Sequence, residues 1–118
     1  MRDAIIDECL EEAIAAGEAG DRKFFLTLEA RRQRDIWLQV RYDYINAAYP
    51  YTEEPFKLLQ DRGVTVPENV TLETWEPHGF ATFDHGAYPQ EPIAQFIHDY
   101  FTNVLRLSPS SFTLKVIR

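Results

Sequence analysis

Two neighbouring segments in the first half of the chain have a period of two residues, and this pattern restricts the fold more than any other feature. In "KFFLTLEA" the apolar residues Phe24, Leu26 and Leu28 occupy alternate positions, and "DIWLQVRYDYIN" keeps the same period from Ile36 to Tyr44. Successive side chains of a β-strand point to opposite faces of a sheet, so each segment is predicted to be a strand. The short polar link "ARRQRD" between them favours an antiparallel pair.

The second face of this strand pair carries large apolar groups among polar ones. If Ile36, Leu38, Val40, Tyr42 and Tyr44 face the helices, alternation leaves the odd-numbered positions on the other side. A mixed apolar and polar surface is typical of protein interfaces, and two further tyrosines follow closely in the chain. We therefore predict a protein interface, and the competing interpretation is that the same residues pack in the core. The predicted interface residues are Trp37, Arg41, Ile45, Tyr49 and Tyr51.

The remaining segments complete an α+β pattern. Helical periodicity covers residues 3–20 and 89–107, a shorter helix is predicted within 52–63, and strands are predicted within 68–75, 79–85 and 111–118. The strongest helical stripe consists of Ile93, Phe96, Ile97, Tyr100, Phe101, Val104 and Leu105. The order is helix, strand, strand, helix, strand, strand, helix, strand. It predicts one domain over residues 1–118, with a largely antiparallel sheet of about five strands, two longer helices packed on one face and one short helix.

The charge balance limits the partners that this chain is expected to bind. It has 12 basic and 19 acidic residues, a net charge of −7 and a pI near 4.9. Such a surface repels phosphate backbones, so we expect no nucleic-acid ligand and favour a basic protein partner. The basic run at residues 31–34 is more typical of a solvated hairpin connection than of a phosphate site. In its order of elements and its charge, the chain resembles the small acidic chaperones of bacterial secretion systems, although no motif carries this likeness.

Cysteine usage and hydropathy point to a cytoplasmic protein. The single cysteine, Cys9, lies on the apolar side of a helical pattern, and it cannot form a disulfide within the chain. The first residues lack the uninterrupted apolar segment of a secretory signal, and no run approaches the roughly 20 apolar residues that span a bilayer. We therefore expect no membrane association.

The stretch "WEPHGFATFDHGAYPQEP" has two competing interpretations: it forms a catalytic or ligand-binding pocket, or it contains only the turns of a small sheet. It contains two of the three histidines, and a pocket would be formed by Trp75, His78, Asp84 and His85. However, consecutive residues of a strand point to opposite faces, so Asp84 would not orient the His85 imidazole. There is no nucleophile motif and no phosphate-binding glycine loop.

The histidines and acidic residues do not predict a metal site. The third histidine, His98, lies at the margin of the last helical stripe, and the histidines and acids lack the spacing of metal ligands. We therefore predict no catalytic residues, no metal and no cofactor, and we favour polar turn residues at strand ends.

The preferred function is thus a small acidic cytoplasmic protein-binding module without catalytic activity, in the manner of a secretion chaperone or a toxin-neutralising immunity protein. The alternative is an enzyme, small-molecule-binding or metal-binding domain with the pocket named above. A third interpretation is a self-associating structural module, and a homodimer would use the same mixed sheet surface.

Overall fold

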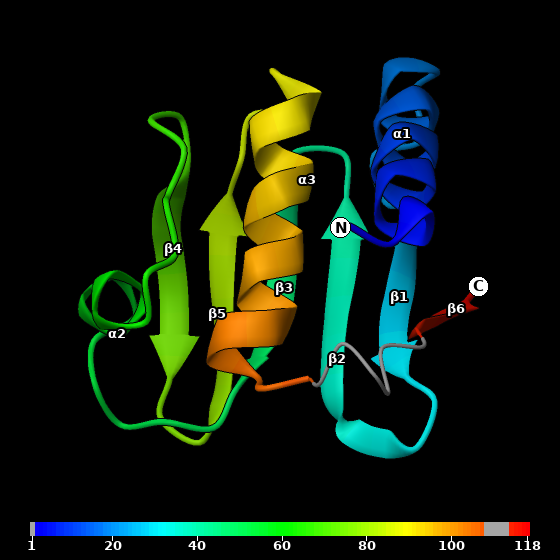
Figure 1. Ribbon diagram of the computed structural model, residues 1–118. Helices are drawn as coiled ribbons and strands as arrows, with labels where there is room; N and C mark the ends of the chain where they lie inside the picture. The colour runs from blue at the N-terminus through cyan, green and yellow to red at the C-terminus, as the bar shows by residue number, and fades with distance from the viewer. Residues whose placement is uncertain (1, 108–113) are drawn as a thin grey trace.

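The computed structural model describes residues 2–107 and 114–118, and its centre is one antiparallel sheet. The strands lie in the order β4-β5-β3-β2-β1-β6, with every described pair antiparallel (Figure 1). Their bounds are β1 Phe25–Ala30, β2 Gln33–Arg41, β3 Tyr44–Tyr49, β4 Thr71–Glu76, β5 Gly79–Asp84 and β6 Leu114–Ile117.

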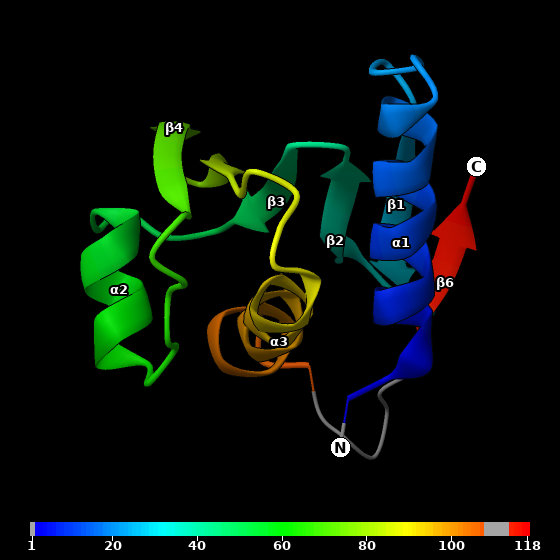
Figure 2. The same ribbon diagram turned by 90° about the horizontal axis from the view of Figure 1, so that it is seen from above.

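Three α-helices cover one face of this sheet. They are α1 (Ala4–Glu18), α2 (Pro55–Asp61) and α3 (Gln90–Asp99), and α3 continues into a π-helical turn, η1 (Tyr100–Val104). Figure 2 shows all of them on the same side of the strands, with α2 near the β4 edge. The α+β class with two longer helices and one short helix is therefore confirmed. None of the helices in the described part is both long enough and apolar enough to cross a bilayer.

The prediction of one strand from Asp35 to Asn46 is wrong. The chain reverses at Tyr42 and Asp43, so this segment forms two paired strands, β2 and β3, and the described sheet has six strands instead of about five. The turn also inverts the alternation, because Val40 pairs with Ile45 on the helix-covered face. Tyr42 and Tyr44 continue the apolar alternation across this turn, which contains neither Gly nor Pro.

Local sequence signals explain the helix ends. Asp3 caps α1 as predicted, since its carboxylate accepts from the Ile5 N–H at 3.0 Å. In α2, Pro55 occupies the first turn, and the carboxylate of Glu54 accepts from the N–H groups of Phe56 and Lys57.

A glycine brings α1 close to the sheet. Gly17 lies on the buried side of α1, and a Cβ atom there would come within 2.2 Å of the Tyr42 ring. This helix can therefore lie directly on the β2–β3 turn only because position 17 has no side chain.

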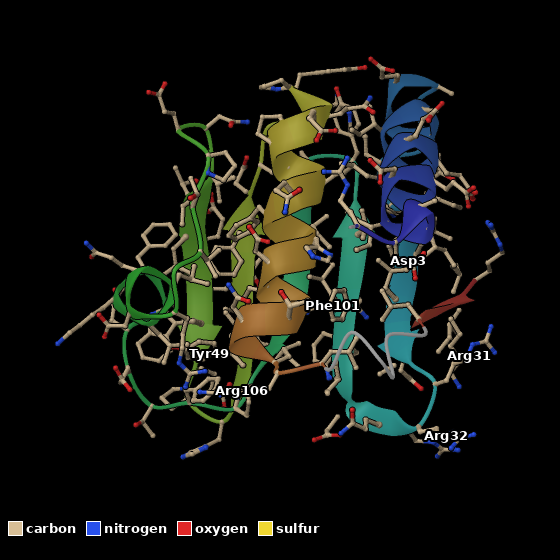
Figure 3. The ribbon with its side chains drawn as sticks, in the orientation of Figure 1. Asp3, Arg31, Arg32, Tyr49, Phe101 and Arg106 are labelled. Atoms are coloured by element: carbon tan, nitrogen blue, oxygen red, sulfur yellow. The ribbon has the colours of Figure 1, made fainter. Side chains whose placement is uncertain are left out.

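The hydrophobic core lies between the helices and the sheet. All seven residues of the predicted stripe on the last helix are buried, which confirms that helix as a main core element. Phe96 packs edge-to-face with Phe83 of β5, and Phe101 is fully buried one turn further along (Figure 3). The hydroxyl of Tyr100 donates to the carbonyl of Ala48 at 2.7 Å, which joins η1 to β3. Leu114 and Val116 share one face of β6, as predicted, whereas Phe112 lies outside the described residues.

Candidate functional site: the open face of the sheet

The sheet surface turned away from the helices is called the open face here. Paired residues of antiparallel strands project from the same face, so the register assigns its members. On the four central strands and on β6 they are Phe25, Thr27, Glu29, Trp37, Gln39, Arg41, Tyr44, Asn46, Ala48, Phe80, Thr82, Asp84, Lys115 and Ile117. Strong exposure of large apolar side chains is rare in the described part, and two of the three cases, Phe25 (48%) and Ile117 (43%), lie on this face.

A polar stripe crosses the middle of the open face. Thr82, Asn46 and Gln39 stand side by side on β5, β3 and β2. The Thr82 hydroxyl donates to Oδ1 of Asn46 at 2.9 Å, and Nδ2 of Asn46 lies 3.4 Å from Oε1 of Gln39. The stripe keeps hydrogen-bonding groups on a surface that also carries aromatic rings, as mixed interfaces do.

Arg41 and Tyr44 form one side of this stripe. The guanidinium of Arg41 lies 4.5 Å from the centre of the Tyr44 ring and donates to the Tyr44 hydroxyl. Its Nη2 donates to the backbone carbonyl of Arg22 at 2.7 Å, which ties β2 to the loop before β1. Arg41 is thus held in place by neutral oxygens and an aromatic ring.

The open face contains a hollow of about 580 Å³ next to Arg41. Its lining comes from five strands or their turns and includes aromatic, amide, hydroxyl and carboxylate groups: Phe25, Gln39, Arg41, Asp43, Tyr44, Asn46, Glu73, Thr82 and Asp84. The hollow is open to solvent. Its size falls in the range of roughly 300–1,000 Å³ that is usual for ligand sites.

Glu73, which lines the hollow, lies at a β-bulge in β4. The pairing of β4 with β5 shifts between Leu72 and Thr74, so Glu73 is the extra residue. Leu72 and Trp75 both pack against the core although they are three positions apart, which a regular strand would not allow. That odd spacing is the sequence signal that could have indicated the bulge.

The predicted interface residues divide between the two sides of the sheet. Trp37 and Arg41 lie on the open face as expected, and both are half-buried. The placement of Ile45 on this face is wrong, because the turn at Tyr42–Asp43 directs its side chain into the core, where it is fully buried. Tyr44, predicted to face the helices, takes the open-face position instead.

Tyr49 and Tyr51 belong to the helix-covered side. Tyr49 is fully buried (Figure 3), and its ring packs edge-to-face with Trp75 at 5.8 Å. Its hydroxyl donates to the carbonyl of Glu53 at 2.6 Å. The Tyr51 hydroxyl donates to the carbonyl of Val104, and the guanidinium of Arg62 lies 5.0 Å from the Tyr51 ring. These two tyrosines hold the connection to α2 and the end of η1, so they are poorly placed to contact a partner on the open face.

The residues of the alternative pocket are not brought together. His78 is exposed in the two-residue turn between β4 and β5, where its φ of 59° gives the turn its left-handed residue. His85 follows the opposite end of β5, Asp84 lines the hollow on the open face, and Trp75 packs on the core side. The expectation that Asp84 and His85 point to opposite faces is consistent with this arrangement.

His85 is fully buried and both of its ring nitrogens are occupied. Nδ1 accepts from the N–H of Ala87 at 3.1 Å, and Nε2 lies 3.2 Å from the carbonyl of Arg41, to which it donates in the neutral ring. Burial lowers the pKa of the imidazole below its ordinary value, while the nearby Arg41 carbonyl and the Asp84 and Asp43 carboxylates act in the opposite direction. A neutral ring that joins β5 to the end of β2 is a structural element.

Metal-binding and nucleophilic groups are dispersed. Within residues 2–107 and 114–118, no three His, Cys, Asp or Glu side chains form a group that could hold a metal ion. His98 is half-buried on α3, and Cys9 is buried on α1, where desolvation raises the thiol pKa to about 11. At neutral pH this thiol is protonated, so it is a poor nucleophile.

Comparison of the chain with protein-family models, with curated proteins and with solved structures finds no match. The open face and its hollow therefore have to be interpreted from their own geometry and chemistry.

Proposed function

We propose that this protein is a protein-binding module without catalytic activity, and that its partner docks on the open face of the sheet. In role it would correspond to a secretion chaperone or an immunity protein, acting in the cytoplasm. The observation that carries the proposal is that three helices cover one face of the sheet, whereas the other face is left with Phe25, Ile117 and Trp37 around a polar stripe. An uncovered mixed surface of this kind is suited to a non-obligate partner.

The sheet edges support docking on the face. A free edge strand can add a strand from another chain unless a bulge, short length or lysine disfavours the pairing. β4, at one edge, is interrupted by the bulge at Glu73, and β6, at the other, carries Lys115. Edge-to-edge association is therefore disfavoured at both sides, which supports docking on the open face.

The enzyme alternative receives less support because its four residues are distributed over a turn, the core and the open face. A pocket on the open face does exist, but its polar groups are amides, hydroxyls, carboxylates and Arg41, whose terminal nitrogens already donate to Tyr44 and Arg22. None of these groups has the arrangement of a nucleophile oriented by a base. Recognition of a side chain is a chemically simpler use for such a hollow.

A capture experiment with matched variants tests the proposal. Trp37→Ala alters the open face, and Glu8→Ala alters an exposed position of α1 on the opposite side of the molecule. We expect Trp37→Ala to lose the bound partner, or a sedimentation-detected dimer, while Glu8→Ala keeps it. Trp37 is half-buried and packs against the core, so binding is compared under conditions in which denaturant unfolding shows that both variants are folded. Equal binding by folded Trp37→Ala and wild type would reject the open face as the docking surface.

A further inference from the structure

The charges around the hollow on the open face are unbalanced. Asp43, Glu73 and Asp84 contribute three carboxylates, and Arg41 is the single basic residue in the lining. None of the three carboxylates forms a salt bridge within the described part of the chain. The Asp84 carboxylate accepts from the Gly86 N–H at 3.0 Å, which fixes its position without neutralising its charge.

Arg41 offsets only part of this negative charge, since it is one cation beside three carboxylates and forms no salt bridge with them within the described part of the chain. Its two terminal nitrogens donate to the Tyr44 hydroxyl and the Arg22 carbonyl, and its plane lies over the Tyr44 ring. The hollow therefore keeps an excess of negative charge at a place where the sheet face is uncovered. A phosphate or carboxylate ligand would be repelled, whereas a cation would be attracted.

The hollow also offers groups that suit a long basic side chain. Phe25, 48% exposed, provides an aromatic wall on which aliphatic stems or a guanidinium can pack. The neighbouring amides of Gln39 and Asn46 can accept from a guanidinium and can also bond to the backbone of an extended segment. The chain as a whole carries a net charge of −7, which favours encounter with a basic partner over a second copy of itself.

We propose that the hollow receives a lysine or arginine side chain from an extended basic segment of the partner protein, held beside Asp43, Glu73 and Asp84. This inference rests on the proposed function and names the chemistry of the partner. The basic side chain would supply the positive charge that the hollow lacks, and the polar stripe would support the segment on either side of it.

The test uses a short acetylated and amidated peptide in which arginine alternates with valine, and a matched peptide in which neutral citrulline replaces each arginine. Binding is followed by amide chemical shifts of the ¹⁵N-labelled protein at low ionic strength. We expect saturable shifts centred on residues 39–46 and 82–84, and binding of the citrulline peptide weaker by about tenfold or more. Higher salt should reduce this difference.

Isosteric variants localise the effect. Asp84→Asn and Glu73→Gln each remove one charge while keeping the shape of the side chain. Each should lower the affinity for the arginine peptide severalfold and leave the affinity for the citrulline peptide unchanged. Glu8→Gln on the outside of α1 is the matched control and should leave both affinities unchanged. Equal affinities for the two peptides, or shifts centred on α1, would overturn the inference.

Two outcomes separate this inference from the proposed function. If Trp37→Ala abolishes partner binding but the arginine and citrulline peptides bind equally, docking on the open face is supported and the proposal that the hollow receives a basic side chain is wrong. If the protein forms a dimer that Arg31→Glu and Arg32→Glu dissociate, the occupant is the exposed β1–β2 turn of a second copy, and the inference is overturned.

Discussion

The helix-covered face and the open face are formed by alternate residues of the same strands, but one carries mainly apolar side chains and the other a mixture of polar and apolar ones. On the covered face Leu38 and Val40 are fully buried against the helices. On the open face their neighbours Gln39 and Arg41 are only half-buried and take part in hydrogen bonds. We therefore expect substitutions on the covered face to change the free energy of unfolding more than substitutions on the open face.

The largest expected effect comes from opening the core under the last helix. Phe96→Ala should destabilise the protein by about 3–5 kcal/mol, because the ring is buried and packs on Phe83. Phe25→Ala, an aromatic truncation on the open face, should change the free energy of unfolding by less than about 1 kcal/mol. Denaturant unfolding at unchanged slope measures both. Similar losses for the two variants would remove the contrast between the faces.

The second comparison involves two adjacent residues at the start of β3. Ile45→Ala should cost about 2–5 kcal/mol because its side chain is fully buried, and Tyr44→Ala should cost less than about half as much. A strand that continued through Tyr42 and Asp43, as the alternation alone predicted, would give the reverse order. The two free energies of unfolding thus test the β2–β3 turn directly.

A smaller effect is expected from the pH dependence of His85. Its folded pKa lies below the ordinary value of 6.5, so the unfolded chain binds the proton more readily. Stability contributed by the neutral ring is present above about pH 6.5 and is lost as the pH falls toward the folded pKa. Between about pH 7.5 and 5.5, wild type should therefore lose more stability than His85→Gln. An identical pH dependence in wild type and His85→Gln would mean that the buried ring does not titrate differently on unfolding.

Sequence patterns predicted the fold class because each relevant signal is local. The stripe that includes Phe96 and Phe101 has helical spacing over several turns, and Asp3 stands at the predicted helix start. The β2–β3 turn was missed because Tyr42 and Tyr44 extend the alternation across it. One missed turn inverts every later side-chain assignment on that strand, which is why Ile45 was placed on the wrong face.

The candidate site was only partly predictable, since it depends on pairing between distant strands. Trp37 and Arg41 were identified from alternation within one strand. The contributions of Asn46, Thr82 and Asp84 require the β3–β5 register, which no local pattern contains. Glu73 lies at the bulge in β4, for which the three-residue spacing of Leu72 and Trp75 was the single sequence clue.

The most direct test of the open face as the docking surface is site-specific photo-crosslinking in cells that produce the protein. A photoreactive amino acid replaces Gln39, in the centre of the open face, or Glu8, on the exposed side of α1, in otherwise identical proteins. Docking on the open face predicts a discrete higher-mass adduct from position 39 and none from position 8. An adduct from position 8 with none from position 39, in proteins of equal stability, would contradict it.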